Sequence, residues 1–153
     1  EAAKARVASL RAAGIAIGKR QLSSALRVAS LDADSRQSLA AFAEPVYLHQ
    51  AVERSNGRLR RYADLPEALG AAAPGAELRV HFHVPVFLEK MEHFGTTQGF
   101  LAEILALHRA EPISRHLEVE TYTWDVLPEA YRKADLGSAI ARELNWVKAQ
   151  RLQ

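Results

Sequence analysis

The chain has 153 residues, a length that fits one domain with a substantial core. Hydrophobic residues make up 48% and charged residues 25%, which excludes a disordered or collagen-like protein, and the lack of cysteine excludes disulfides and thiol catalysis. A net charge of +2 is too small to indicate nucleic-acid binding, and no apolar run approaches the ~20 residues of a membrane span.

The first part of the chain is expected to contain a helix, a strand and a second helix. Residues 1–13 have helical spacing and end at Gly14, and because no capping residue stands in front of them we expect further sequence upstream. A strand is predicted over 15–24. Asp32 or Asp34 is the expected N-cap of the second helix.

A β-hairpin is predicted over residues 46–62, where Asn56-Gly57 separates two polar-interrupted runs. We expect His49 to be exposed in this hairpin. Asp64 then caps a brief helix.

The second half of the chain is expected to alternate strands and helices. Strands are predicted over 78–87 and 117–124, and helices after Thr96 or Thr97 and after Asp135. The expected buried faces of these helices are Phe100, Ile104 and Leu107 in the first, and Leu136, Ile140, Leu144 and Val147 in the second. Because each helix can cross over to the next strand, the alternation predicts parallel strand pairing.

Polar side chains are expected to share one face of each predicted strand, since alternate residues of a strand point the same way. The three rows are Lys19, Gln21 and Ser23; His81 and His83; and Glu118, Glu120 and Tyr122. Buried carboxylates require compensation. Water would supply it on the solvent side of a sheet, whereas in a closed parallel barrel a metal or a polar substrate would be the partner.

Simpler interpretations stand beside these. His81 and His83 are as well explained as a hydrogen-bonded structural pair, and Glu118 better as a structural residue. Glu120 is favoured as functional because it lies nearer the end of its strand. Imidazole and carboxylate together suit Mn, Co, Fe or Zn. Tyr122 and Trp124 fit either packing or the lining of a sugar-sized site.

Several stretches of the chain resemble the EboE family of metabolite traffic proteins, which is related to the sugar phosphate isomerases and epimerases. The most specific are residues 81–87 (HFHVPVF), 94–97 (FGTT) and 117–128 (LEVETYTWDVLP), and residues 18–26 and 47–50 fit the same pattern. The resemblance implies an α/β fold, the xylose-isomerase-like (β/α)8 TIM barrel. Residues 1–153 would be the C-terminal part of that single domain, about three βα units, with the hairpin over 46–62 inserted.

The resemblance also implies a site at the ends of the later strands. Glu120 corresponds to a last-strand glutamate that is both metal ligand and acid/base. His83 and Gln21 fall where related enzymes place metal-ligating histidines, and the metal would be Mn, Co, Fe, Zn or Mg. Lys19, Ser23, His81, Tyr122 and Trp124 are the expected substrate-binding residues.

The leading functional hypothesis is a metal-assisted isomerase- or epimerase-like protein that acts on a small hydroxy-carbonyl metabolite. Gln21 in place of histidine and the added hairpin favour an alternative, a non-catalytic metabolite carrier or chaperone. A relative of metal-dependent endonucleases is a weaker alternative, because no basic stripe is evident and nucleic acid is not an expected partner. The resemblance implies a bacterial, cytoplasmic protein and a membrane prenyltransferase-like partner from the same gene cluster.

Overall fold

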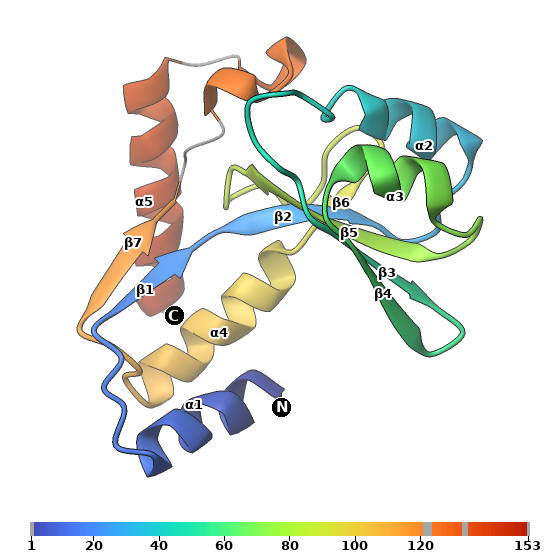
Figure 1. Cartoon of the computed structure of the whole chain (residues 1–153). Helices are drawn as coiled ribbons and strands as arrows, with labels where there is room; N and C mark the ends of the chain where they lie inside the picture. Colours follow the sequence, from blue (N-terminus) through green and yellow to red (C-terminus); the bar gives the residue numbers. More distant parts are fainter. Residues whose placement is uncertain (1, 121–123, 133–134, 153) are drawn as a thin grey trace.

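The computed structural model describes residues 2–120, 124–132 and 135–152, and Figure 1 shows its elements in chain order. Helix α1 (Ala2–Ala12) comes first and buries none of its residues. Gly14 follows it at a φ of 70°, the left-handed conformation in which glycine commonly ends a helix. The predicted helix and its end are therefore confirmed.

The larger of the sheets in the described residues has five strands in the order β4-β3-β5-β2-β6. Every neighbouring pair in it is antiparallel. The strands are β2 (Ser24–Val28), β3 (Ala51–Ser55), β4 (Arg58–Tyr62), β5 (Glu77–Val84) and β6 (Gly95–Thr96). Strands β3 and β4 form the predicted hairpin, which begins at Ala51 rather than at residue 46, and Asn56 and Gly57 turn it with φ values of 49° and 74°.

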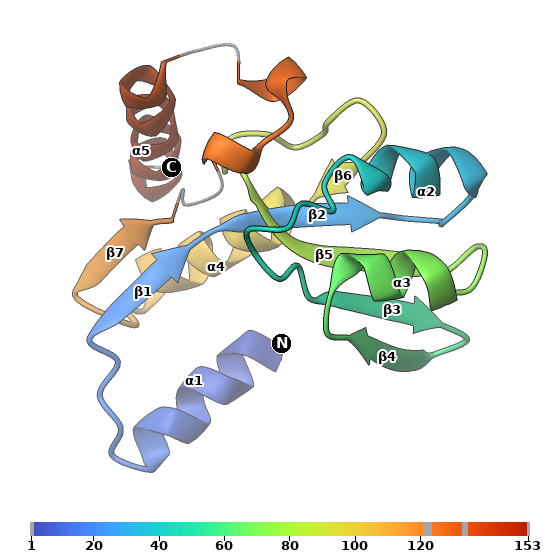
Figure 2. The same cartoon turned by 45° about the horizontal axis from the view of Figure 1, so that its top comes forward.

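Helices α2 (Ala33–Ala40) and α3 (Leu65–Ala71) lie together on one face of this sheet (Figure 2). Asp32 caps α2 by accepting a hydrogen bond from the Ser35 backbone, and Asp64 caps α3 by accepting one from the Leu65 backbone. The main hydrophobic core lies between these helices and the sheet. Its largest fully buried members are Tyr62, Phe82, Leu26, Leu31, Leu39, Leu65, Leu78 and Val80.

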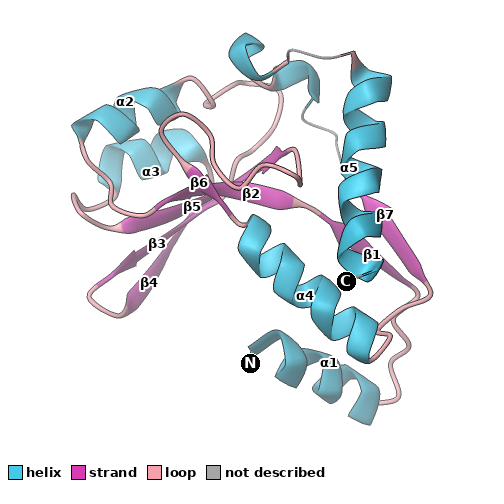
Figure 3. Ribbon diagram, turned by 180° about the vertical axis from the view of Figure 1, so that it is seen from behind, coloured by secondary structure: helices cyan, strands magenta, loops and turns pink. Residues whose placement is uncertain are grey.

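A smaller, two-stranded sheet pairs β1 (Lys19–Leu22) with β7 (His116–Val119) in parallel. Helices α4 (Gln98–Ala110) and α5 (Leu136–Leu152) pack beside it, as Figure 3 shows from behind. The core between them is formed by Leu22, Val86, Leu101, Leu105 and Val147. The predicted last strand is shorter than expected: residues 121–123 are outside the described part, and Trp124–Val126 form a short 3-10 helix.

The described residues form a mixed α/β structure whose sheets are not closed into a barrel. Parallel pairing is correct for β1 and β7, but wrong for the histidine strand β5, which runs antiparallel to both β2 and β3. Helices cover one face of the five-stranded sheet, and antiparallel sheets commonly leave the other face in water. His81 is exposed on that other face, whereas His83, near the end of β5, is buried.

The buried faces of α4 and α5 differ in part from the predicted ones, although Ile104 and Val147 are buried as expected. Leu101, Ile104, Leu105 and His108 are buried in α4, whereas Phe100 is 55% exposed. In α5 the described buried residues are Ala139, Glu143 and Val147, and Leu136 and Leu144 are exposed. The face of α5 is set by Glu143, which accepts a hydrogen bond from the Val86 backbone and therefore points inward.

The ends of these helices follow the predicted caps more closely. Thr97 occupies the N-cap of α4, but its hydroxyl accepts a hydrogen bond from the Ala25 backbone and so ties the helix to β2. Thr96 accepts one from the Gln98 backbone, and Asp135 accepts one from the Ser138 backbone. Among the helices described, none is both long and apolar enough to cross a membrane.

Candidate functional site

The candidate site is centred on His81 and His83, which lie on the face of β5 that α2 and α3 do not cover. Val80 and Phe82 alternate with them and are fully buried on the opposite face. Alternation in an extended strand is the reason that both imidazoles share one side. This part of the sequence-based prediction is confirmed.

The two imidazole rings are joined directly. Nε2 of His81 lies 2.9 Å from Nε2 of His83, and the ring centroids are 4.8 Å apart. Nδ1 of His81 lies 2.9 Å from the side-chain oxygen of Gln50, which precedes β3. In this hydrogen bond one Nε2 atom carries the proton and the other accepts it. The tautomer of one ring therefore fixes the tautomer of the other.

The environment of His83 favours its neutral form. Burial lowers the pKa of His83 to about 4, and the positive charge that His81 can carry acts in the same direction. Hydrogen bonding with the Glu120 backbone opposes both effects. The side chain is only 4% exposed. His83 is therefore a neutral imidazole at physiological pH, the form that can accept a proton or bind a metal.

Glu120 brings a carboxylate to this pair from the other sheet. Its backbone donates a hydrogen bond of 3.0 Å to Leu22, which continues the pairing of β7 with β1 by one residue. Its Oε2 atom lies 4.0 Å from Nδ1 of His83, and the side chain is 31% exposed. The predicted catalytic residue and two predicted site histidines are thus neighbours in space.

A second layer behind the pair was missed by the sequence reasoning. His49 is fully buried, not exposed in the hairpin as expected, and its Nδ1 lies 3.2 Å from the backbone oxygen of His81. Its Nε2 lies 2.8 Å from Oε1 of Glu44. The Glu44 carboxylate also accepts hydrogen bonds from the Val46 and Tyr47 backbones. A Glu and a His five residues apart outside a regular element form no recognisable sequence pattern.

Burial alone would raise the pKa of the Glu44 carboxyl, but hydrogen bonds from Val46, His49 and Tyr47 more than offset it and lower the pKa. The carboxylate is therefore ionised at neutral pH. It holds the His49 ring in place, and that ring contacts the backbone of β5 at His81. The Glu44–His49 pair thus fixes the strand that carries the candidate site.

The polar row on β1 has other partners. Nζ of Lys19 lies 2.7 Å from Oε2 of Glu118, with both side chains about half exposed. Gln21 stands opposite Glu118 in the parallel pairing and is exposed. Ser23 is half-buried between β1 and β2. The predicted structural role of Glu118 is consistent with its ion pair.

Two further predicted site residues follow Glu120 along the chain. Tyr122 lies outside the described residues. Trp124 begins the short 3-10 helix, and only its backbone is described.

The donor set fits a divalent metal in part. The Nε2 atoms of His81 and His83 converge, and Glu120 lies on the opposite nitrogen of His83, where a carboxylate can orient a metal-binding imidazole. Over residues 2–120, 124–132 and 135–152, no three His, Asp or Glu side chains are grouped closely enough to hold a metal ion. The described part thus brings together two imidazoles and one carboxylate.

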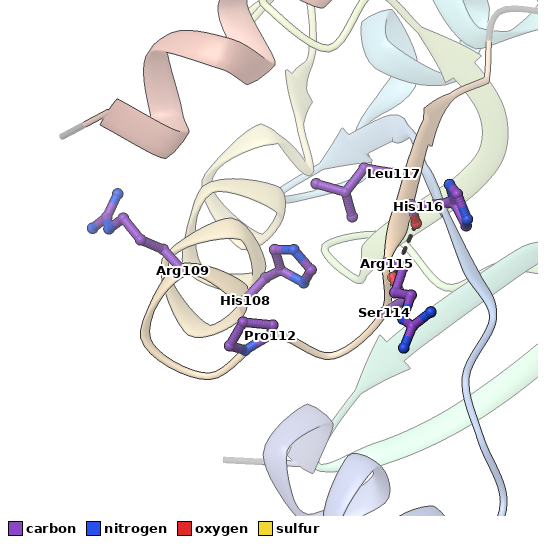
Figure 4. A pocket seen from close by; sticks show the side chains of 7 residues that line it. All are labelled: His108, Arg109, Pro112, Ser114, Arg115, His116 and Leu117. Atoms are coloured by element: carbon purple, nitrogen blue, oxygen red, sulfur yellow. Dashed lines mark hydrogen bonds between the residues drawn. The ribbon is translucent and has the colours of Figure 1, made fainter.

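A cavity of about 450 Å³ lies at the opposite end of β7, between the last turn of α4 and the loop that follows it. Figure 4 shows that His108 and Leu117 point toward one another there, whereas Arg109 and His116 point away. Nδ1 of His108 accepts a hydrogen bond from the Ile113 backbone. Because its basic groups diverge, this cavity is a weaker candidate than the histidine pair.

Fold and site together define a mixed α/β chain with a histidine pair and a carboxylate at the junction of two sheets. Comparison with protein-family models gives no match, and comparison with curated proteins and with solved structures gives no significant match.

Proposed function

We propose that the protein binds a small hydroxy-carbonyl metabolite beside His81, His83 and Glu120. We further propose that it acts on this metabolite as a sugar phosphate isomerase- or epimerase-like enzyme, assisted by a divalent metal. The observation that carries the proposal is the 4.0 Å approach of the Glu120 carboxylate to the buried imidazole of His83. A carboxylate and a neutral imidazole side by side can move a proton at neutral pH.

The roles of the side chains follow from their exposure. Glu120 is partly exposed and can reach a bound ligand, so it is the group that removes and returns a proton at the carbon beside the carbonyl. His83 is buried and neutral, and its Nδ1 atom lies 4.0 Å from the Glu120 carboxylate. His81 is exposed on the same face, where its Nδ1 atom contacts Gln50 and its Nε2 atom contacts His83. Tyr122 and Trp124 follow Glu120 and remain candidates for ligand binding.

His81 and His83 would hold the metal through their converging Nε2 atoms. When bound, a divalent ion supplies positive charge that polarises a carbonyl oxygen and its neighbouring hydroxyl. Gln21 is a weaker candidate ligand because it is exposed and stands opposite Glu118. A cytoplasmic location and a membrane prenyltransferase-like partner belong to the same proposal and have only the family resemblance as support.

Exchange of substrate hydrogen with solvent tests the proposal. The chain, loaded with Mn²⁺ or Co²⁺, is incubated in D₂O with a panel of short ketoses and aldoses and their phosphates, and deuterium is measured at the carbon beside the carbonyl. We expect incorporation into at least one member, and a loss of about 10²–10⁴-fold in Glu120→Gln. Glu118→Gln is the matched control, because it removes a carboxylate two residues earlier that is paired with Lys19.

The metal is tested separately by titrating Co²⁺ and following its visible absorption. We expect about one ion per chain, with binding weakened in His81→Gln and His83→Gln and unchanged in Glu118→Gln. No deuterium incorporation, together with Co²⁺ binding that both histidine substitutions leave unaltered, would contradict the proposed enzyme.

A metabolite carrier is the second candidate. The observation in its favour is that the described residues supply two converging imidazoles without a third metal-binding side chain. A carrier would retain a metabolite through purification and release it unchanged, with no deuterium incorporated in D₂O. Mass spectrometry of the ligand released by mild denaturation distinguishes this outcome from catalysis.

A further inference from the structure

Four arginines lie on the same face of the five-stranded sheet as His81 and His83, toward the beginning of β5. Arg27 on β2 stands opposite Arg79 on β5, and Arg54 on β3 stands opposite Glu77 on β5. Arg61 on β4 stands opposite Val52, which shares a strand face with Arg54. We call Arg27, Arg54, Arg61 and Arg79 the arginine face.

Glu77 holds three of these arginines together. Its Oε1 atom lies 3.1 Å from Nε of Arg27 and 2.9 Å from Nε of Arg79, and Oε2 contacts Arg54. The Glu77 side chain is only 10% exposed, whereas the three guanidinium-bearing side chains are 43–56% exposed. One buried carboxylate therefore fixes three cations in place and leaves them open to solvent.

Charge on this face is strongly unbalanced. One carboxylate among four arginines leaves three positive charges in excess on a chain whose net charge is only +2. Guanidinium groups held side by side repel each other unless anions neutralise them. Because each presents a planar set of N–H donors, carboxylates are fitting partners.

The same face contains an apolar depression. A shallow cavity of about 350 Å³ is lined by Val52, Leu59, Arg54, Arg79 and Glu77. Leu59 stands opposite Arg54 in the hairpin and is 64% exposed. The lining of this cavity includes no aromatic ring on which a nucleic-acid base could stack. The combination of an apolar floor and cationic walls fits a peptide better than a nucleic acid.

We propose that the arginine face is a docking surface for an acidic segment of a partner protein. An aliphatic side chain of that segment occupies the depression between Val52 and Leu59, and carboxylates on either side of it pair with Arg54, Arg61 and Arg79. β4 lies at one end of the strand order, so an extended segment can also pair with its backbone. Binding at this surface does not depend on the proposed proton transfer, and Arg79 lies two residues before His81 on β5.

The test uses fluorescence anisotropy with labelled peptides and the full chain. One peptide contains leucines flanked by aspartates, a second has each leucine replaced by serine, and a thymidine oligonucleotide of equal charge is the third probe. We expect the leucine peptide to bind most tightly. Arg61→Glu should weaken its binding about fivefold to tenfold, since an attractive exposed pair becomes repulsive. Leu59→Asp should weaken it as well.

Arg61 and Leu59 are chosen because they are exposed and do not hold Glu77, so the sheet is expected to fold in both variants, which circular dichroism checks. Arg115→Glu makes the same change in charge in the loop before β7, outside this face, and should leave binding unaltered. Equal weakening by Arg115→Glu would mean attraction by net charge alone and would overturn the proposal. Equal binding of the serine peptide, or tighter binding of the oligonucleotide, would overturn it too.

Discussion

The Oε2 atom of Glu120 lies 4.0 Å from Nδ1 of His83, and this approach brings together residues from the two sheets that the structure describes. Glu120 directly follows β7 of the parallel pair, and His83 belongs to β5 of the antiparallel sheet. Neither sheet alone would form the site, because each contributes one of the two groups. The burial of His83 at this junction is also what keeps the imidazole neutral.

The neutral state of His83 predicts a loss of stability in mild acid. In the unfolded chain this histidine takes up a proton near its ordinary pKa of 6.5, whereas in the folded chain it does so only near pH 4. The unfolded state therefore binds more protons in this interval, and the free energy of unfolding falls as the pH decreases from 6.5 to 4. The expected loss is about 2–3 kcal/mol.

Urea unfolding of the wild-type chain and of His83→Gln, with a chelator present, measures this effect. The difference in unfolding free energy between the two should change by the stated amount between pH 7 and pH 4. His93→Gln is the control, since the His93 side chain is 52% exposed. If the unfolding free energies of wild type and His83→Gln differ by a constant amount from pH 7 to pH 4, His83 titrates normally in the folded protein.

Features that depend on near neighbours in the chain were predictable from the sequence. The Asn56-Gly57 turn and the Asp32 and Asp64 caps each involve residues at most three positions apart, and all of them are found in the structure. The common face of His81 and His83 was predictable for the same reason, because it requires only that the strand be extended.

Features that depend on distant partners were not predictable in this way. Whether β5 pairs in parallel or antiparallel is decided by β2 and β3, and the local pattern of alternation is compatible with either. His49 is buried because β5 lies against it, and α5 turns Glu143 inward because the Val86 backbone requires an acceptor. Each involves partners more than 20 positions apart in the chain.

The lowered pKa of Glu77 predicts a second loss of stability in acid, at a lower pH than the loss that His83 causes. Burial alone would raise the pKa of its carboxyl, but hydrogen bonds from Arg27, Arg79 and Arg54 lower it from 4.5 to about 2. A lowered folded-state pKa stabilises the protein above pH 4.5, and this contribution disappears as the pH falls from 4.5 to 2. Because the arginines are half exposed and screened by solvent, we expect it to be about 1–2 kcal/mol.

Glu77→Gln should lower the free energy of unfolding at pH 7 by this amount, and the difference from wild type should vanish near pH 2. Urea midpoints at a series of pH values provide the measurement. Glu92→Gln removes an exposed carboxylate and should match the wild type throughout. A Glu77→Gln variant as stable as wild type at pH 7 would mean that the three arginines gain nothing from this carboxylate.

The raised pKa of Glu143 predicts that stability depends on pH in the opposite direction. Burial raises the pKa of its carboxyl, and the hydrogen bond from the Val86 backbone opposes this only in part. The folded state then holds a proton that the unfolded state releases above pH 4.5, so stability falls as the pH rises through the raised pKa. Glu143→Gln keeps an acceptor for Val86 without the charge. It should be more stable than wild type at pH 8 by about 0.5–2 kcal/mol, and the gain should shrink toward pH 4.

Glu143→Ala separates the charge from the hydrogen bond. It leaves the buried Val86 N–H without its acceptor, which costs about 1–3 kcal/mol, so this variant should be less stable than Glu143→Gln at every pH. Glu103→Gln, on the exposed side of α4, controls for the loss of one carboxylate. Thermal or urea unfolding at pH 4, 6 and 8 gives the comparison. A Glu143→Gln variant that is less stable than wild type at pH 8 would show that the folded protein stabilises the ionised carboxylate.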